Sequence, residues 1–491
     1  MELGSILHFL ENSCILVTGA TGFLAKIFIE KILRVQPNVK RIYVLLRAQD
    51  TNAAILRFNT EVISKDLFRV LKGNCGENFD SFLSKKVRVV AGDITCENLG
   101  VKDTNLLDEM WEEIDIVVNS AANTNFDERY DTSFKINTLG ALHVLGFSKK
   151  CPKLKVLLHV STAYVCGEKG GLIMEKPYKM GETLNGGTSG LHIYSEKKLM
   201  EEKLKQLGIQ YSSQHDIESA MKDFGIQRAR KFGWPNTYVF TKAMGEMVLG
   251  QLKENVPVVI IRPTIITSTF KEPFPGWAEG VRTIDSLSVG YGKGKLTCFT
   301  GDPESIVDVI PADMVINSMI VAMAANADQP NESIYHVGSS VSNPLELKWF
   351  QEYGHIYFSQ NPWIDKDGKP VIVGKVKLFD TIDSFHRYMY LHYLLPLKGL
   401  EVLNTACCQY FDNIYVESCR KIKFVMRLVD LYVPYLFFKG CFDDLNTEKL
   451  RRLAKESCVE AEMFYFDPKD IKWDEYFMKI HIPGTVKYVF K

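Results

Sequence analysis

The chain has 491 residues, and its 59 Lys and Arg residues balance 59 Asp and Glu residues. A chain of this length can form two or three domains with large cores, and it is neither disordered nor of low complexity. The balanced charge gives no overall field that would attract nucleic acid, so no nucleic-acid partner is expected. The 11 cysteines include no Cys-x-x-Cys pair, and we expect reduced, buried thiols in a cytosol-facing protein.

The N-terminal residues give no sign of a targeting segment. Residues 1–10 lack a basic stretch, a long apolar run and a small-residue cleavage site, so no signal or transit peptide is expected. No window of about 20 apolar residues occurs. The nearest candidates, at 388–397 and 424–438, are broken by charge or proline. A membrane-spanning helix is therefore not expected.

Short apolar runs alternate with stretches of helical periodicity in the first half of the chain. Repeated strand and helix in this order predict an α/β fold with a doubly wound parallel sheet and right-handed crossovers, as in a Rossmann domain. Amphipathic segments at 24–33 and 138–149 separate some of these runs. The predicted strands are 14–17, 41–46, 87–90, 114–118 and 156–160, with a sixth at 256–261.

Longer segments interrupt or follow this pattern. Residues 167–236 hold two charged helical stretches and are too long for a simple crossover, so we expect an insertion that forms part of a substrate mouth or covers the sheet. From about residue 376 the chain is helical and rich in aromatic and basic residues. We therefore predict a nucleotide-binding domain at 1–375, which includes substrate-binding segments, and a helical C-terminal domain at 376–491.

A glycine-rich turn directly follows the first predicted strand and opens the first helix. Gly19 permits a tight turn, and Gly22 lets the backbone approach a pyrophosphate at the helix N-terminus. Because this pattern lies between a strand and a helix, it predicts a dinucleotide site rather than an ordinary turn. The turn residues expected at the cofactor are Thr18, Gly19, Thr21, Gly22, Phe23 and Leu24.

The ends of later strands supply the other expected cofactor contacts. Arg47 follows the second strand, where an NAD-preferring site usually has an acidic residue, and arginine suits the 2′-phosphate of NADPH. The alternative is that Arg47 is a solvated strand end. Asp93 and Ile94 follow the third strand, where we expect the adenine, and the small Ala121 after the fourth leaves room for the dinucleotide. Pro263 follows shortly after the sixth strand, and we expect it at the same site.

A tyrosine and a lysine four residues apart share one face of a helix. The ammonium can then stabilise the phenolate and also reach a cofactor ribose, which makes the tyrosine a proton donor. The spacing alone decides nothing, because it occurs at Tyr194/Lys198, Tyr238/Lys242, Tyr291/Lys295, Tyr435/Lys439 and Tyr465/Lys469.

Position along the chain favours Tyr238 and Lys242. Their helix, predicted at 238–252, runs directly into the sixth strand, so it packs on the sheet between the fifth and sixth strands. The helix of Tyr194 instead leads into a polar run with no strand after it. Glycines interrupt the helix of Tyr291, the pair at 435 lies in the aromatic C-terminal region, and Pro468 disfavours a helix through Lys469.

The fifth strand ends in two hydroxyl residues. A hydroxyl at the carboxyl end of this strand can hydrogen-bond a substrate oxygen beside the nicotinamide. Successive residues point to opposite faces, so we expect one of the two to face the site and choose Thr162 over Ser161. The predicted catalytic residues are therefore Thr162, Tyr238 and Lys242, and no metal ligand is predicted.

These motifs resemble the extended short-chain dehydrogenase/reductases and, more closely, the alcohol-forming fatty acyl-CoA reductases of the plant branch. The resemblance covers essentially the whole chain and departs at none of the presumed catalytic positions. It rests on the segments 18–26, 38–40, 126–130, 159–165, 238–243, 261–264, 272–277 and 308–313, and on a C-terminal module that ends near 466–468.

The resemblance implies a function. It implies NADPH-dependent, four-electron reduction of a long-chain or very-long-chain fatty acyl-CoA to a primary alcohol and CoA, through an aldehyde, for wax or another lipid barrier. In that reaction Thr162 and Tyr238 hydrogen-bond the substrate oxygen, Lys242 lowers the tyrosine pKa, and Tyr238 donates the proton. The resemblance also implies peripheral, cytosol-facing association with the endoplasmic reticulum.

Other functions and locations stay open at this point. One alternative is an extended reductase for a sterol, a flavonoid or a sugar nucleotide. Another is a catalytically silent NADP-binding scaffold, although such a protein would be expected to have lost Thr162, Tyr238 or Lys242, and all three are present. The stretches 385–397 and 420–438 could dock on a membrane surface or form core helices of the C-terminal module.

Overall fold

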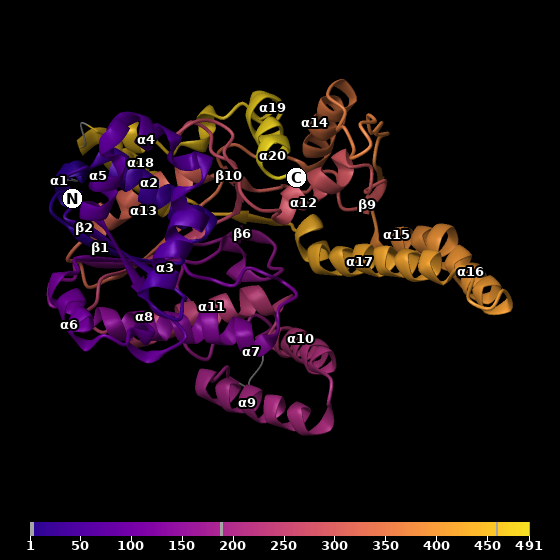
Figure 1. The fold of residues 1–491 in the computed structure, drawn as a ribbon, viewed down its shortest axis with the longest axis horizontal. Helices are drawn as coiled ribbons and strands as arrows, with labels where there is room; N and C mark the ends of the chain where they lie inside the picture. The colour runs from indigo at the N-terminus through magenta and orange to yellow at the C-terminus, as the bar shows by residue number, and fades with distance from the viewer. Residues whose placement is uncertain (1–3, 187–189, 458–459, 491) are drawn as a thin grey trace.

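A computed structural model describes residues 4–186, 190–457 and 460–490. Its centre is a seven-stranded parallel sheet with the strand order β11-β7-β5-β4-β1-β2-β3 (Figure 1). The order reverses between β1 and β4, as the predicted doubly wound fold requires. The strands are β1 (Cys14–Thr18), β2 (Arg41–Leu46), β3 (Val87–Ala91), β4 (Ile116–Asn119), β5 (Val156–Val160), β7 (Val258–Pro263) and β11 (Glu332–Val337).

Helices cover both faces of the sheet. In β1, Ile15 and Val17 pack into one core while Cys14 and Leu16 pack into another, because successive side chains point to opposite faces. On the first face lie α1 (Ile6–Leu10), α2 (Phe23–Val35), α13 (Ala312–Asn326) and α18 (Leu445–Ser457); on the second lie α6 (Thr104–Glu113), α8 (Gly140–Ser148) and α11 (Thr237–Leu252) (Figure 1). Residues between β2 and β3 form α3 (Thr51–Arg57), α4 (Arg69–Cys75) and α5 (Phe79–Lys86).

Each of the six predicted strands forms within two residues of its expected bounds. The sixth predicted strand, at 256–261, is β7 and runs two residues later, because the amide of Val256 closes a turn onto the carbonyl of Lys253. The edge strand β11 was not predicted. It contains Glu332, Ser333 and His336, so it lacks the continuous apolar run of a central strand.

The predicted insertion contains two helices that form a hairpin beside the sheet domain (Figure 1). They are α9 (Ile193–Gln210) and α10 (Gln214–Lys231), close to the helical stretches expected from the sequence. A short strand of the same insertion, β6 (Gly171–Ile173), pairs with β13 (Gly440–Phe442) from near the end of the chain. The insertion is therefore connected to the C-terminal region.

The chain after β7 also forms smaller units outside the seven-stranded sheet. They comprise the strand pairs β8 (Ile265–Thr267) with β10 (Val309–Pro311) and β9 (Cys298–Thr300) with β12 (Lys377–Phe379), and the helices α12 (Thr283–Gly292) and α14 (Leu347–Gln360). We name residues 382–436 the arm; it holds α15 (Ile382–Met389), α16 (Leu395–Ala406) and α17 (Asp412–Leu436) and extends away from the sheet (Figure 1).

After the arm, the chain returns to the sheet domain. Leu450 and Ala454 of α18 pack in the same core as α13, and Tyr476, Phe477 and Ile482 are buried near the last helix, α20 (Ile482–Tyr488). The C-terminal region is thus helical, as predicted. It consists of a projecting arm and a returning segment that shares the core of the sheet domain.

The ten described cysteines are all free thiols. Cys14, Cys151, Cys166 and Cys298 are buried, whereas Cys96, Cys407 and Cys408 are exposed. The expectation of buried thiols therefore holds for only part of the set.

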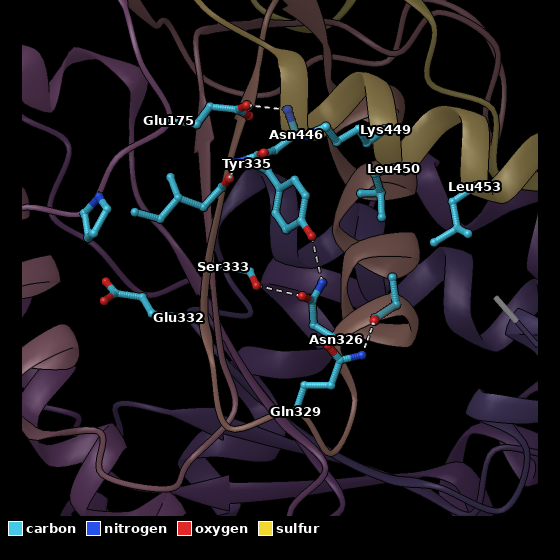
Figure 2. A pocket seen from close by; sticks show the side chains of 13 residues that line it. Glu175, Asn326, Gln329, Glu332, Ser333, Tyr335, Asn446, Lys449, Leu450 and Leu453 are labelled. Carbon is cyan, nitrogen blue, oxygen red and sulfur yellow. Dashed lines mark hydrogen bonds between the residues drawn. The ribbon is translucent and has the colours of Figure 1, made fainter. Parts of the chain in front are cut away.

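Figure 2 shows the hollow where α18 meets the edge strand β11. The carboxylate of Glu175 accepts hydrogen bonds from the backbone amides of His336, at 2.8 Å, and Asn446. The side-chain amide of Asn446 donates to the carbonyl of Ile334 at 3.1 Å. Side chains from two distant segments therefore satisfy the free edge of β11, which would otherwise present unpaired backbone groups.

We expect Glu175→Ala to destabilise the protein by about 3 kcal/mol, because two buried backbone amides lose their acceptor. Urea unfolding followed by circular dichroism measures the change. The matched control is Glu332→Ala in the same hollow (Figure 2), where no side-chain hydrogen bond to another described residue is lost and the expected cost is below about 1 kcal/mol. Equal costs for the two variants would contradict the role assigned to Glu175.

Candidate active site

The helix α11 brings Tyr238 to the end of β5. The helix starts at Asn236, whose side-chain oxygen accepts from the amide of Val239 at 3.1 Å and caps the first turn. The Tyr238 side chain is only partly exposed, and its hydroxyl interacts with the Thr162 side chain. Burial raises the pKa of the Tyr238 hydroxyl, and the interaction with Thr162 lowers it in part. Two of the three predicted catalytic residues therefore meet.

Lys242 lies one turn further along the same helix face. Its side chain is 1 % exposed, and Nζ donates to the carbonyl oxygen of Val160 at 2.7 Å. Nζ also lies 3.2 Å from Nε2 of His159. Burial lowers the pKa of Lys242 to about 8, although the charge of Glu246 partly raises it. The ammonium is thus held against the last two residues of β5, directly before Ser161 and Thr162.

The other four tyrosine–lysine pairs lie elsewhere. Tyr194 is 67 % exposed on α9, whereas Tyr238 is half-buried. The helix α12 ends one residue after Tyr291, and α17 ends at Leu436, before Lys439. Tyr465 precedes the short 3-10 helix that carries Lys469 and is not part of it. Among the described residues, Tyr238 and Lys242 are therefore the pair that the fold brings to Thr162.

The glycine-rich turn after β1 fits a dinucleotide. Gly19 has a φ of +71°, and a Cβ there would lie 2.6 Å from Cα of Ala121, so the position requires glycine. Gly22 precedes α2 and offers no side-chain cap, which leaves the first amides of this helix open to an anion. The buried hydroxyl of Ser161 has no hydrogen-bond partner in the described residues and can serve a ligand.

The remaining predicted cofactor residues end neighbouring strands at one edge of the sheet. The parallel register pairs Thr18 with Leu45 of β2 and with Asn119 of β4, so their carboxyl ends lie side by side. Arg47 is exposed directly after β2. Asp93 and Ile94 follow β3, and Pro263 is the buried last residue of β7.

A cluster of aromatic residues from three distant segments lies beside Tyr238. Phe126, in the loop after β4, stacks on the Tyr238 ring at 5.5 Å between centroids. The Phe126 ring also contacts Tyr432 at 5.7 Å and Tyr435 at 5.4 Å, both from α17. Tyr435 also contacts Tyr164 at 5.1 Å, and its hydroxyl accepts from Asn236 at 2.7 Å.

The sequence did not single out these contacts as site features. Phe126 was noted only as part of a family motif, and the tyrosines of α17 only as aromatic residues of the C-terminal region. His159 was a polar residue inside an apolar strand, which was the available signal for a function.

Two family models, both described as male sterility protein, match residues 17–319, as an NAD-binding domain, and 392–491. The chain is 60 % identical over 490 residues to the alcohol-forming fatty acyl-CoA reductase of Simmondsia chinensis, with 99 % of each chain covered. The chain belongs to the fatty acyl-CoA reductase family. This reductase is also 54 % identical over 490 residues to probable fatty acyl-CoA reductase 4 of Arabidopsis thaliana, again with 99 % of each chain covered.

Solved structures share the fold of the reductase at low identity. The reductase domain of a nonribosomal peptide synthetase from Mycobacterium tuberculosis is 15 % identical, with a TM-score of 0.54, over 98 % of this chain and 94 % of that chain. The terminal reductase domain of the myxalamid pathway is 18 % identical, with a TM-score of 0.52, over 92 % and 88 %. Both likenesses agree with the predicted extended short-chain reductase fold.

We expect Gly19→Ala to weaken binding of a reduced nicotinamide dinucleotide by at least about 100-fold, because the added Cβ meets the Ala121 backbone and alanine disfavours a positive φ. Titration followed by cofactor fluorescence measures the affinity. Gly73→Ala is the matched control, because Gly73 lies in α4 with no atom within 4 Å of an added Cβ. Unchanged affinity in the Gly19 variant would contradict the assignment of this turn to the cofactor.

Proposed function

We propose that this reductase converts a long-chain or very-long-chain fatty acyl-CoA to a primary alcohol and CoA, through an aldehyde, with four electrons from two NADPH. The physiological role that we propose is the synthesis of wax or another lipid barrier. One observation carries the proposal: Thr162, Tyr238 and Lys242 converge at the end of β5, on the strand edge that bears the dinucleotide turn. The family membership of the chain supports the same substrate class.

The three residues can stabilise charge on a carbonyl oxygen. A bound reduced nicotinamide supplies hydride to the carbonyl carbon. Thr162 and Tyr238 offer hydroxyl groups to the oxygen, so the negative charge that develops there is met by hydrogen bonds in a buried site. The thiohemiacetal formed from the thioester then loses CoA as a thiolate. At the aldehyde stage Tyr238 donates its proton to the oxygen, and the ammonium of Lys242 stabilises the resulting phenolate.

Two guanidinium groups near the end of β2 support NADPH as the cofactor. Arg47 is exposed there, and Arg57 of α3 donates a hydrogen bond to the carbonyl oxygen of Arg47. Arg57 is also paired with Glu61 at 2.7 Å. A planar guanidinium suits the 2′-phosphate that distinguishes NADPH from NADH.

The surroundings of Tyr238 support an apolar substrate rather than a sugar nucleotide. Phe126 stacks on the Tyr238 ring, Tyr432 and Tyr435 pack on Phe126, and the three rings offer apolar surface beside Tyr238. The Tyr432 hydroxyl interacts with Ser286 of α12, and the next residue of that helix, Leu287, lines a small apolar hollow. Leu296, Phe299, Leu347 and Phe350 line the same hollow.

We expect Tyr238→Phe to lower alcohol formation by at least about 100-fold, because the proton donor and one oxyanion donor are lost together. Yeast that express each variant are analysed for new fatty alcohols, and the purified proteins are assayed with acyl-CoA. The control is Tyr194→Phe, at an exposed tyrosine with the same spacing, which keeps most of the activity. The reverse pattern would overturn the site assignment.

The same assay distinguishes the alternatives. Equal rates with NADPH and NADH would contradict the cofactor proposed from Arg47. Turnover of a sterol, a flavonoid or a sugar nucleotide without turnover of acyl-CoA would identify a different extended reductase. Cofactor binding without turnover of any substrate would identify a catalytically silent scaffold.

We also propose that the arm binds the surface of the endoplasmic reticulum from the cytosolic side. Within residues 4–186, 190–457 and 460–490, no helix combines the length and the apolar character needed to cross a bilayer. The arm exposes apolar side chains beside basic ones, a combination suited to a membrane surface. Its exposed apolar residues are Tyr390, Leu391, Leu395, Val402, Leu403, Tyr410 and Ile414, and its exposed basic residues include Lys398, Arg420, Lys421 and Lys423. The compartment rests on the family resemblance.

We expect the triple substitution Leu391→Asp, Val402→Asp and Leu403→Asp to reduce binding to anionic phospholipid vesicles by at least about tenfold, because three apolar side chains no longer enter the interface. Co-sedimentation with vesicles measures binding. The matched control carries Leu56→Asp and Ile209→Asp, at exposed apolar residues outside the arm. If the arm variant sediments like wild type, the arm is not the anchor.

A further inference from the structure

A chain of buried polar groups crosses the sheet and ends on Lys242. The amide of Ala121 donates to the hydroxyl of Thr18 at 3.2 Å, and this hydroxyl donates to the side-chain oxygen of Asn119 at 2.7 Å. The side-chain nitrogen of Asn119 lies 3.0 Å from Nδ1 of His159, and Nε2 of His159 lies 3.2 Å from Nζ of Lys242. The chain thus links the dinucleotide turn to the proposed catalytic helix.

Every side chain in this network is buried. Thr18 is 0 % exposed, Asn119 is 2 % exposed, and His159 and Lys242 are each 1 % exposed. Burial and the charge of Lys242 hold the pKa of His159 well below its ordinary value, so its ring stays neutral. Buried polar groups without partners are costly, which is why such a network has to be satisfied internally.

Lys242 has no carboxylate partner at hydrogen-bond distance among the described residues. Glu246, one turn along α11, is the carboxylate whose charge acts on it. The carboxylate of Glu246 is bound to the guanidinium of Arg262, with an Nη2–Oε2 distance of 2.6 Å. Arg262 is in turn 3.4 Å from Nε2 of His336, whose ring burial keeps neutral. Among the described residues, the close partners of the ammonium are therefore a carbonyl and a neutral imidazole.

The network can satisfy Lys242 in both of its charge states. In the orientation described, Asn119 offers its NH2 group to Nδ1, so the ring proton is on Nε2 and Nζ accepts it as a neutral amine. A half-turn of the Asn119 amide offers its oxygen instead. The ring proton then sits on Nδ1, and Nε2 accepts from the ammonium. Thr18 matches either orientation, because a hydroxyl can donate or accept.

We propose that His159 is a positioning residue for catalysis, which holds Lys242 at the end of β5 and, with Asn119 and Thr18, keeps its nitrogen hydrogen-bonded whether it is charged or neutral. The inference rests on the proposed function, in which the ammonium stabilises the Tyr238 phenolate. A neutral acceptor holds the lysine in place and leaves its positive charge, which this role requires, uncompensated. A carboxylate would hold the lysine but would also neutralise that charge.

The substitutions His159→Gln and His159→Asn separate the two ends of the ring. Glutamine can place an acceptor near the position of Nε2, beside Lys242, whereas asparagine reaches only the position of Nδ1, beside Asn119. Two readouts are measured between pH 6 and 10: kcat with acyl-CoA and NADPH, and the dissociation constant of NADPH followed by fluorescence. Thermal unfolding checks that each variant is folded.

The expected results follow from the charge of Lys242. Activity needs the ammonium, so it falls as the pH rises through the lysine pKa, which burial has lowered to about 8. Asparagine removes one of two acceptors and destabilises the ammonium, so the alkaline limb of both profiles moves to lower pH by about one unit and kcat falls by about tenfold or more. Glutamine keeps the limb at the wild-type pH and loses less kcat. The inference is overturned if the alkaline limbs of the asparagine variant lie at the wild-type pH, or if the limbs of the asparagine and glutamine variants shift equally.

A second variant covers a failure of the asparagine protein to fold. In Asn119→Asp the carboxylate only accepts, which holds His159 in the tautomer that accepts from the ammonium and adds a negative charge nearby. The alkaline limb should then move to higher pH, and a fixed or lowered limb overturns the inference. If wild type binds NADPH with this pH dependence but does not reduce acyl-CoA, the proposed function fails and the role of His159 in holding Lys242 stands.

Discussion

The buried ion pair between Glu246 and Arg262 is the interaction on which the rest of the site depends. Both side chains are at most 2 % exposed, so each charge would be very costly without the other. Glu246 belongs to α11 and Arg262 to β7, so the pair holds the helix on the sheet. Arg262 also donates to the carbonyl oxygen of Lys176, which fastens the insertion to the same point. Because the Glu246 carboxylate is bound to Arg262, it does not form an ion pair with Lys242. The positive charge of Lys242 can therefore act in the site.

The start of α11 is tied to the C-terminal region in a comparable way. Asn236 uses its oxygen to cap the helix and its nitrogen to donate to the hydroxyl of Tyr435, so one side chain joins two segments about 200 positions apart. Arg427 of the arm pairs with Asp127, next to the Phe126 that stacks on Tyr238. Residues that lie far from the dinucleotide turn in sequence therefore shape the surroundings of Tyr238.

The features that could be predicted from the sequence are those with a short-range pattern of residues. The strands β1 to β5, the glycine-rich turn and the helix of Tyr238 each have a short-range signature of apolar runs, special glycines or helical spacing. The roles of His159 and Asn119 depend on which strands become neighbours, and their contacts with Lys242 and Thr18 have no such signature. The edge strand β11 was missed for a related reason, because its stability comes from Glu175 and Asn446, which belong to distant segments. Long-range packing decided these features.

The return of the chain to the sheet after the arm has a consequence for biosynthesis. When the ribosome has released the first 437 residues, β11 still lacks Asn446 and α18, and β6 lacks its partner β13. The nascent chain therefore carries an open sheet edge and uncovered apolar surface until its last 50 or so residues emerge, which takes several seconds at ordinary translation rates. During that interval the open edge and the uncovered apolar surface are the parts of the chain most exposed to wrong pairing.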